Sequence, residues 1–405
     1  MKKTKFLILA CLGVYMEKIW TKPFINICTT NFLLFFAFYL ILPILPLYIT
    51  EEFKAGKTVS GIVLAAYTAG ALISRPFAGY FVDSFNRKKL FLISYILYSS
   101  IFIGYFTAGF LALLAFTRFV HGIVFGSVST TSNTIAVDLL PSARRGEGIG
   151  YYGVAFNIAF ALGPMTGAFI CEKWGFDAVF YTSLAICTIG TFLAIPLKTK
   201  QKAIKKDATP ISFDRFFLTS AVPQFLCLIF VGFAYGPVIN YLTLYGNSVG
   251  VEKVAGPFYS LIAVGLISSR LLIAKHIDRG YIIQIIAIGT LILASAFGIL
   301  GFFHYRSTFF VAALLIGIGN GMICPSYQTL FVNMARHNQR GTASSTYLTG
   351  WDVGIGTGIL LGGIIAEHLS YGAIFAISAF VVFIGAGVFY FFAAPHYNAH
   401  KLENA

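Results

Sequence analysis

Ionisable side chains are scarce in the apolar stretches of this chain, so those found there are the first candidates for chemistry. Asp352 is the one acidic residue deep within such a stretch, about two turns inside a predicted helix over 343–367. A carboxyl group at that depth either binds and releases a proton during a conformational cycle or accepts structural hydrogen bonds from Ser, Thr or a helix end. We favour the proton-binding role.

Arg118 and His121 form a second candidate site. Arg118 lies about six residues inside a predicted helix over 111–136, where a cation is costly and is therefore a functional candidate. Snorkelling of the long side chain to the nearer interface is the alternative. His121 follows about one turn later; it either shares the role of Arg118 or packs as a core residue, and packing is the favoured reading.

Nothing in the sequence indicates nucleophilic or nucleotide chemistry. The 6 Cys residues form no C-x-x-C pattern, and the phosphate-binding pattern G-x-x-x-x-G-K-[ST] is missing, so ATP does not drive the protein directly. We expect that the protein is not an enzyme and has neither a metal site nor a cofactor.

The elements that hold these residues are those of a membrane protein. Hydrophobic residues make up 58% of the chain and charged residues 11%, compared with about 25% charged residues in soluble domains. These values exclude soluble globular, disulfide-rich secreted and disordered chains. Apolar stretches of about 20 residues, the length that crosses a bilayer, recur along the chain. They predict an all-α membrane protein with twelve transmembrane helices, at 24–49, 58–81, 90–108, 111–136, 147–171, 176–197, 216–246, 254–275, 281–303, 307–333, 343–367 and 371–393.

The distribution of Lys and Arg predicts the orientation of these helices. With the N-terminus in the cytoplasm, 21 of the 29 Lys and Arg residues fall in cytoplasmic segments and five in the opposite loops, while Arg75, Arg118 and Arg270 lie within helices. Cytoplasmic loops of membrane proteins carry such an excess. Both termini are therefore expected in the cytoplasm, and the net charge of +14 reflects topology and not nucleic-acid binding.

The start of the chain has more than one interpretation. Lys2, Lys3 and Lys5 precede an apolar run over 6–16, as in a secretory signal peptide. The run is too short to span a membrane, no small-residue cleavage site follows it, and Met16 can itself be the start. We favour a short cytoplasmic tail or a start at Met16.

An internal repeat with a constant offset of 195 residues divides the chain. Uncommon residues recur at this offset without a gap, so we expect two six-helix halves in the same orientation, an architecture found among membrane transporters. The repeated pairs include Arg75 and Arg270, Asp83 and Asp278, Gly122 and Gly317, Gly126 and Gly321, Gly163 and Gly358, and Gly167 and Gly362. The predicted segments are an N-terminal tail over 1–23, halves over 24–197 and 216–393, a polar cytoplasmic linker over 198–215, and a tail over 394–405.

The end of the second predicted helix carries an acid followed by a basic cluster. The excess of Lys and Arg in cytoplasmic loops does not explain an acid such as Asp83. An acid at this position can cap the N-terminus of a neighbouring helix and hold one conformation closed. The segment resembles the G-x-x-x-D-x-x-G-[RK]-x-[RK] motif of the major facilitator superfamily. Gly79, Asp83, Arg87 and Lys89 match it, and Asn86 replaces the glycine, where we expect a left-handed turn that Asn tolerates. The second copy of the motif keeps only Asp278.

Two further segments carry this resemblance. Arg118 to Gly122 resemble the R-x-x-Q-G element of the superfamily, with His121 in place of Gln, and the resemblance implies a role of this arginine in proton coupling. Gly163, Pro164 and Gly167 are similar to its antiporter motif, which favours efflux over uptake. Small residues recur every four positions in this helix and its repeat, so both helices are expected to pack closely on neighbours, either statically or as a sliding contact.

The substrate is expected between the halves. Asn157 occupies the position that Asp352 has in the other half, which suggests that one half carries the proton. The lack of other charges near the midplane favours a neutral, cationic or amphipathic substrate over a polyanion. Candidate cavity residues are Tyr39, Asn133, Asn157, Tyr235, Asn240, Tyr327, Gln328 and Trp351.

These features predict a monomeric secondary transporter of a bacterial inner membrane, whose partners are a small-molecule substrate, protons and the lipid bilayer. The favoured function is proton-coupled efflux of amphipathic drugs or metabolites, with Asp352 taking up the proton and Arg118 tuning or relaying it. An uptake permease for a sugar or small metabolite is the first alternative. A non-transporting receptor or scaffold is the second, since a fold does not fix a function.

Overall fold

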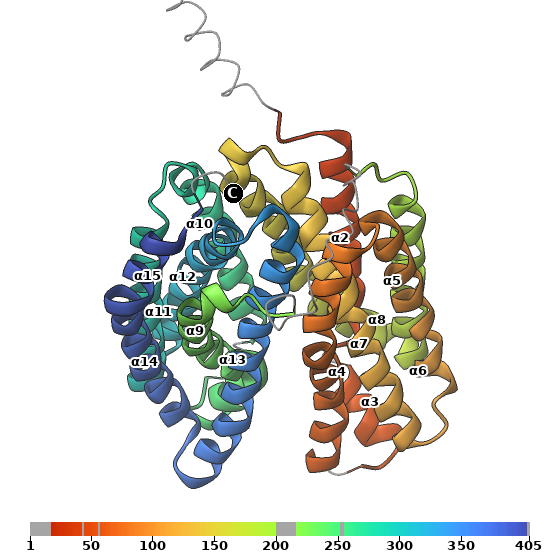
Figure 1. Ribbon diagram of the computed structural model, residues 1–405. Coiled ribbons are helices and arrows are strands. Elements are labelled where there is room, and N and C mark those ends of the chain that lie inside the picture. Colours follow the sequence, from red (N-terminus) through yellow and green to blue (C-terminus); the bar gives the residue numbers. More distant parts are fainter. Residues whose placement is uncertain (1–17, 43, 56, 200–215, 252–254, 403–405) are drawn as a thin grey trace, which may run out of the picture.

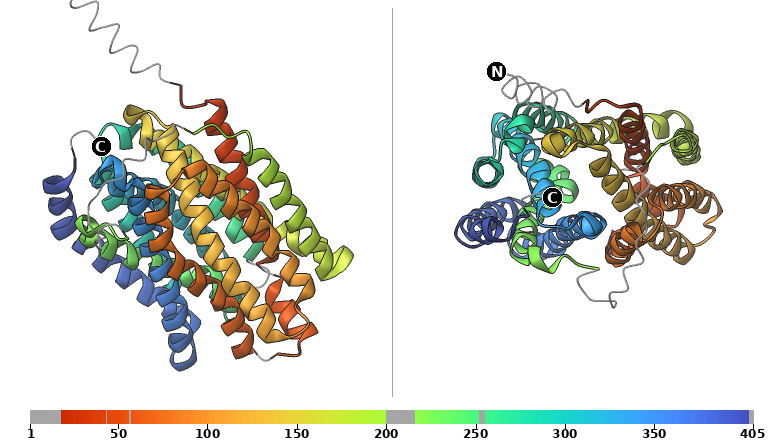
Figure 2. Two further views of the ribbon diagram at one scale, coloured as in Figure 1. Left: turned by 45° about the vertical axis from the view of Figure 1, so that its right-hand side comes forward. Right: turned by 45° about the horizontal axis from the view of Figure 1, so that its top comes forward.

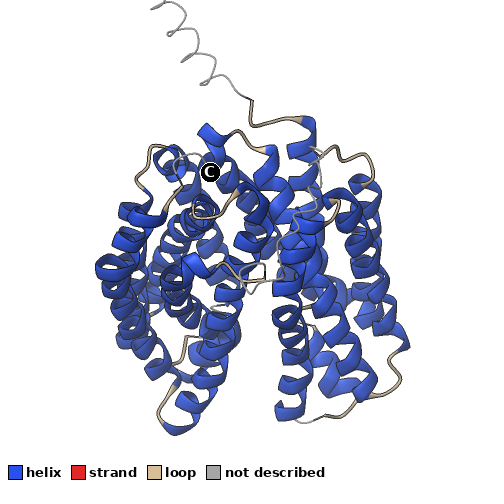
Figure 3. Cartoon of the chain, in the orientation of Figure 1, coloured by secondary structure: helices blue, strands red, loops and turns tan. Residues whose placement is uncertain are grey.

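The computed structural model describes residues 18–42, 44–55, 57–199, 216–251 and 255–402. Within these ranges the chain is helical and has no strand (Figure 3). Eleven of the described helices are long and apolar enough to cross a membrane. The helices lie side by side in two sets (Figure 1), which we call the N-terminal group (α2 to α8) and the C-terminal group (α9 to α15). Most of the predicted tail over 1–23 and of the linker over 198–215 lies outside the described residues.

In the described residues, the N-terminal group holds seven α-helices and one 3-10 turn. They are α2 (Lys22–Ile41), α3 (Leu45–Glu52), α4 (Lys57–Ser84), α5 (Arg87–Ile101), α6 (Ile103–Thr107), α7 (Leu111–Leu139), η1 (Ser142–Arg144) and α8 (Arg145–Ala194).

The C-terminal group begins after the linker. It consists of η3 (Thr219–Ala221), α9 (Val222–Ser248), α10 (Ala255–Asp278), α11 (Ile282–Phe302), α12 (Arg306–Asn333), η4 (His337–Gln339), α13 (Arg340–His368), α14 (Tyr371–Val388), η5 (Phe389–Ala393) and α15 (Ala394–His400).

Helix α8 joins two helices that the sequence predicts as separate, over 147–171 and 176–197. Helical hydrogen bonding runs from Arg145 to Ala194, and Gly175 alone departs from helical geometry, with φ 81° and ψ −179°. Such a positive φ strains residues that have a side chain, so a glycine suits the break. The helix therefore has two arms, 145–174 and 176–194, that meet at Gly175.

Other predicted helices are interrupted where proline or a local turn intervenes. The first predicted helix is divided into α2 and α3, and α3 starts with a proline in its first turn, a position that needs no N–H donor. The third is divided near Phe102 into α5 and α6. The last continues beyond 393, through the π-helical η5 into α15. Pro395 lacks an N–H group, so the helix widens before it instead of keeping an α-helical ladder.

The repeat predicted from the sequence reappears in the packing of the helices. Gly122 of α7 lies against the Tyr67 carbonyl oxygen of α4, and Gly317 of α12 lies against the Ile262 carbonyl oxygen of α10, at positions 195 residues further along. The side chain of Ser74 similarly approaches Gly126, as that of Ser269 approaches Gly321. In each group the absence of a Cβ thus lets two long helices touch backbone to backbone.

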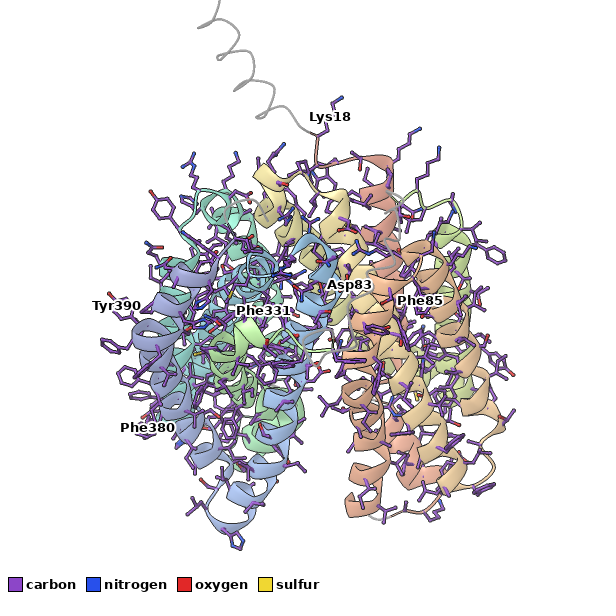
Figure 4. The ribbon with its side chains drawn as sticks, viewed as in Figure 1. Lys18, Asp83, Phe85, Phe331, Phe380 and Tyr390 are labelled. Atoms are coloured by element: carbon purple, nitrogen blue, oxygen red, sulfur yellow. The ribbon has the colours of Figure 1, made fainter. Side chains whose placement is uncertain are left out.

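Both ends of the described chain lie at one face of the bundle, at the top of Figure 1, which we call the terminal face. Lys18 marks this face in Figure 4. Away from it, the ribbons of α4 and α13 diverge towards the bottom of Figure 1. Figure 2 shows the same two groups from other sides, with α8 beside α10 and α4 beside α13. These two helix pairs form most of the contact between the groups.

Candidate functional site

An ion pair joins the two helix groups in the interior of the bundle. Arg75 Nε of α4 donates a hydrogen bond to Asp352 Oδ2 of α13. Arg75 Nη1 also donates to Ser129 Oγ at 3.3 Å, and the guanidinium carbon lies 5.8 Å from the centre of the Phe125 ring. Arg75 is 3% exposed, whereas the Asp352 side chain keeps 17% exposure. Asp352 therefore has a buried cation on one side and solvent-accessible space on the other.

Arg118, the partner that the sequence suggests for Asp352, makes a different set of contacts. It donates to the Leu64 carbonyl oxygen at 3.3 Å and to the Tyr105 hydroxyl at 3.4 Å, and its guanidinium lies 4.4 Å from the centre of the Tyr67 ring. All of these contacts are within the N-terminal group, and none involves Asp352. Arg118 is 2% exposed, so the snorkelling alternative is wrong.

His121 sits in the same aromatic cluster as Arg118. Its Nδ1 is 3.0 Å from the Tyr105 hydroxyl, and its ring centre is 4.2 Å from that of Tyr98 and 4.8 Å from that of Phe102. Its Nε2 is buried and has no hydrogen-bond partner among the described residues. The Tyr105 hydroxyl thus links His121 to Arg118.

Asp83 and Asp278 cap helices of the opposite group. Asp83, at the end of α4, accepts hydrogen bonds from the first backbone N–H groups of α13, and Asp278, at the end of α10, does the same for α8. Because free N–H groups and the helix dipole make such an end positive, a carboxylate is stabilised there. The distances are 2.9 Å from Gly341 N and from Thr342 N to Asp83, and 2.7 Å and 3.0 Å from Gly146 N and Glu147 N to Asp278.

Arg144 helps to fix the start of α8 beside Asp278. Its Nε donates to Glu147 Oε2 at 2.9 Å and its Nη2 to Glu147 Oε1 at 3.0 Å. These two hydrogen bonds raise the pKa of the Arg144 guanidinium. The bidentate pair holds the first turn of α8 in place for the cap.

The basic cluster after Asp83 continues the contact between the groups at the terminal face. Arg87 donates to Asp83 Oδ1 at 3.2 Å and pairs with Asp138 at the end of α7. Asp138 also accepts from Arg340 Nη1 of the C-terminal group at 3.2 Å. Sequence reasoning did not single out Asp138, because it follows the predicted end of its helix. Lys89 is exposed.

Asn86 does not adopt the left-handed turn expected where the motif has glycine. Its φ and ψ are −66° and 111°, and its Oδ1 accepts a hydrogen bond from Lys89 N at 3.0 Å. Asn86 is therefore the N-cap of α5. An N-cap residue takes an extended backbone, and Asn is one of the preferred residues for it.

The contact face of α4 follows a spacing of four residues. Arg75, Gly79 and Asp83 recur at this interval and so lie on one side of the helix, towards α13. Gly79 approaches Ser345 so closely that an added Cβ would lie 2.7 Å from the Ser345 Cβ, and the Ser345 hydroxyl donates to the Arg75 carbonyl oxygen. The ion pair, the close approach and the cap therefore form one continuous seam.

The glycines of the antiporter-like segment face their own group. Gly163 and Gly167 leave room for Tyr39 and the Leu40 carbonyl oxygen of α2, and the repeat-related Gly358 leaves room for the Phe233 carbonyl oxygen of α9. The side chain of Pro164 lies outside the described part of the structure. These small-residue faces therefore pack α8 on α2 and α13 on α9, within the groups and not between them.

Asn133 and Gln328 meet where the two groups face each other. Gln328 Nε2 of α12 donates to Asn133 Oδ1 of α7, and both side chains are buried. Their numbers differ by 195, the offset of the repeat. Equivalent residues of two copies touch only at the axis that relates the copies, so this pair marks the centre of the molecule.

The other predicted cavity residues have different surroundings. Tyr235 and Trp351 are in ring contact, with centres 5.7 Å apart. Tyr39 lies 5.2 Å from the ring of Phe160, which in turn contacts Tyr259 of the other group. Tyr327 is 1% exposed and packs on Phe389 inside the C-terminal group. The side chain of Asn240 lies outside the described part, and Asn157 is fully buried.

Histidine and cysteine side chains do not gather as metal ligands. His396 and His400 of α15 stack with ring centres 4.1 Å apart, at the surface. Among the described residues, no three His, Cys, Asp or Glu side chains lie close enough together to hold a metal ion.

The sequence matches proteins of known family over nearly its whole length. The Major Facilitator Superfamily matches residues 27–356 and 280–405. "Multidrug resistance protein MdtG" of Escherichia fergusonii is 26% identical over 386 residues, covering 90% of this chain and 92% of that protein. "Multidrug resistance protein 2" of Bacillus subtilis is 24% identical, covering 90% and 94%.

Solved structures of the same fold are similar to the whole chain. The human organic anion transporter MFSD10 matches with a TM-score of 0.77 at 17% identity, over 90% of this chain and 98% of that one. The transporter FucP in the outward conformation matches with a TM-score of 0.73 at 16% identity, over 91% and 99%. With a family match over most of its length and this shared fold, the chain belongs to the Major Facilitator Superfamily of membrane transporters.

Proposed function

We propose that the protein exports small amphipathic drugs or metabolites in exchange for protons, by alternating access of a site between the two helix groups. The observation that carries this proposal is the ion pair of Arg75 and Asp352, which joins the groups through a titratable group that keeps contact with solvent. The relatives named as multidrug resistance proteins support the efflux direction, and so does the antiporter-like segment with Gly163, Pro164 and Gly167.

The proposed orientation places the terminal face in the cytoplasm of a bacterial inner membrane. Lys and Arg residues concentrate on this side, as in cytoplasmic loops. The two arms of α8 then cross the membrane in opposite directions, which gives twelve spans in two six-helix halves. The seam of Arg75, Gly79 and Asp83 lies in the cytoplasmic part of α4, so the described state is closed to the cytoplasm and faces outwards.

Proton binding to Asp352 opens the seam in this mechanism. The carboxylate holds Arg75 by charge, and a protonated carboxyl loses most of that attraction. A proton that arrives from outside therefore loosens α13 from α4 and permits opening towards the cytoplasm. The proton leaves there, substrate binds, and the re-formed ion pair closes the cytoplasmic side again. Each cycle moves protons inwards and substrate outwards.

Asp83 and Asp278 act as latches in this cycle. Each holds a helix N-terminus of the opposite half, so both contacts must break when the cytoplasmic side opens and re-form when it closes. Arg87 and Lys89 keep the loop after Asp83 on the cytoplasmic side. Arg118 and His121 act further away: Arg118 binds the Leu64 carbonyl oxygen of α4 and so positions the helix that carries Arg75.

The proposed substrate path lies along the aromatic residues between the halves. Tyr39, Tyr235 and Trp351 offer ring surfaces, and Asn133, Gln328 and Asn157 add amides near the centre. Apolar surface with a few polar groups is the composition of most small-molecule sites. It suits amphipathic compounds better than highly charged ones.

Everted membrane vesicles with an acidic interior test the proposed exchange. A panel of amphipathic compounds is added while a pH-sensitive dye reports the gradient. At least one compound should dissipate the gradient with the wild type and fail to do so with Asp352→Asn. Asp177→Asn serves as the control, because Asp177 is an exposed acid at the turn between the arms of α8. Exchange by Asp352→Asn at the wild-type rate would remove this residue from the mechanism.

A further inference from the structure

Arg270 is a buried cation at the contact between the halves, and no acid of the described residues pairs with it. It occupies the position in α10 that Arg75 has in α4, 195 residues earlier, and is 6% exposed. No ion pair of Arg270 with an acid occurs in the described residues, and its Nε has no hydrogen-bond partner there. The repeat thus places two arginines at the interface but supplies one carboxylate.

The residues around Arg270 differ from those around Arg75. Its guanidinium lies against Gly153 of α8, which leaves it no room to move towards that helix. Four residues further along the same helix face stands Asn157, the counterpart of Asp352. Both the Oδ1 and the Nδ2 of Asn157 are buried without a hydrogen-bond partner among the described residues. A neutral amide therefore stands where Arg75 has its carboxylate.

Other contacts of Arg270 are neutral and come from the C-terminal half. Its guanidinium interacts with the Cys324 thiol of α12, which also contacts the Tyr347 hydroxyl of α13. Arg118 also pairs with no acid in the described part of the chain, but the Leu64 carbonyl oxygen and the Tyr67 ring offset its charge. A buried charge with neutral neighbours is costly. An anion bound beside Arg270 would therefore stabilise it strongly.

One neighbour of Arg270 keeps partial exposure to solvent. Cys324, the neighbour of Arg270, is half-buried although it lies in the middle of α12. Tyr235, next to the ring of Trp351, lies within electrostatic range of Arg270 and Cys324. The charged group and the aromatic rings therefore lie near the half-buried Cys324, and Asn157 lies one helical turn beyond the residue of α8 that Arg270 touches.

We propose that Arg270, assisted by Asn157, binds the oxyanion of the transported substrate, so that the substrates are amphipathic organic anions with a single carboxylate-type group. Arg matches a carboxylate with two parallel N–H donors, and the apolar body of the substrate lies on Tyr235 and Trp351. This inference rests on the proposed transport function and names its substrate class. It departs from the expectation from the sequence, which favoured a neutral, cationic or amphipathic substrate over a polyanion, by assigning the substrate one negative charge.

Protection of Cys324 from a maleimide measures binding without requiring transport. In a full-length protein with Cys11, Cys28, Cys171, Cys187 and Cys227 replaced, Cys324 is the one remaining thiol. The probes are 2-naphthoxyacetate and its primary amide, which differ in the carboxylate alone. The acid should protect Cys324 at a concentration about 10- to 100-fold lower than the amide, the range for a hydrogen bond to a charged group.

Variants of Arg270 test whether this residue causes the stronger protection of Cys324 by the acid than by the amide. Arg270→Gln should remove the preference for the acid, while Arg270→Lys, which keeps the charge but loses the paired donors and is a second check on folding, should retain part of it. Equal protection by acid and amide, no protection by either, or a preference that survives in Arg270→Gln would each overturn the proposal. Acid-selective binding without proton exchange in vesicles would keep this inference and refute the coupling. Proton exchange with neutral compounds, without stronger protection by the acid, would support the coupling and refute this inference.

Discussion

Asp352 and Asn157 occupy equivalent positions of the two halves, yet one is an acid and the other an amide. Asp352 has Arg75 as its partner, whereas Asn157 stands near an arginine that lacks a carboxylate. At the scale of single residues, the protein thus separates two tasks. One arginine is held by a carboxylate of the chain, and the other has no carboxylate partner among the described residues.

A double-mutant cycle on Arg75 and Asp352 tests whether the ion pair joins the halves. Removing one partner leaves the other charge buried, so Arg75→Gln and Asp352→Asn should each lower the free energy of unfolding. The double variant should lower it by less than the sum of the two single effects. The coupling energy should be about 2 kcal/mol, measured from the free energy of unfolding in mixed detergent micelles. Additive losses would show that the pair contributes nothing to closure.

The sequence identified Asp352 because an acid in a long apolar stretch is conspicuous, but it did not identify the partner. Three arginines lie within predicted helices, and Arg118 was preferred for its resemblance to a superfamily element. Arg75 had a signal of its own, since it recurs as Arg270 in the repeat. The choice among the three depends on which helix faces turn towards α13, and single-sequence spacing does not determine that.

Helix packing within each half rests on glycines at which a side chain has no room. Gly358 of α13 lies against the Phe233 carbonyl oxygen of α9, whereas Gly356, two residues earlier, has nothing within 4 Å of an added Cβ. Neighbouring glycines of one helix therefore face different surroundings. This contrast gives a matched pair of substitutions.

Gly358→Ala should lower the free energy of unfolding by about 1–3 kcal/mol, because the new methyl group forces the backbones of α13 and α9 apart. Gly356→Ala should be neutral or stabilising by up to about 1 kcal/mol, since Ala favours the helix. Denaturant titration in mixed micelles compares the two. An equal effect of both substitutions would contradict the packing described here.

Most helices were predictable from the length of apolar stretches, and their interruptions were not. The stretch over 24–49 has no charged residue, yet it contains the boundary of α2 and α3. The opposite error occurs at Gly175, where the predicted loop between two helices is a single non-helical residue. Apolarity reports that a segment is in the membrane, but continuity depends on local backbone geometry. For Asn86 likewise, residue type allowed a left-handed turn or an N-cap, and the adjoining helix determined the outcome.

The contact of Asp83 with a helix N-terminus was foreseeable from its position at a helix end. Its partner was not, because the partner helix begins 257 residues later, at Arg340 in the other half. At the scale of the whole molecule, the repeat explains why a second cap exists: Asp278 holds α8 as Asp83 holds α13. The two caps close the terminal face from both sides.

Removing either cap should shift the molecule towards opening at the terminal face. Asp83→Ala and Asp278→Ala each remove hydrogen bonds to a helix end, with a cost of about 0.5–2 kcal/mol. Spin labels at Phe85 and Arg336, which are exposed residues of the two halves, report the distance between them. Each variant should increase the population with the longer distance, and the double variant should increase it further. An unchanged distance distribution would refute the role as latches.

Proton release on substrate binding tests the central claim most directly. Purified protein in weakly buffered detergent solution is mixed with a compound that dissipates the gradient in vesicles, and the released protons are counted with a pH indicator. The account predicts release by the wild type at acidic pH and none by Asp352→Asn, which still binds the compound. Equal release by both proteins, or binding by the wild type with no release at any pH, would contradict an exchange of substrate against a proton on Asp352.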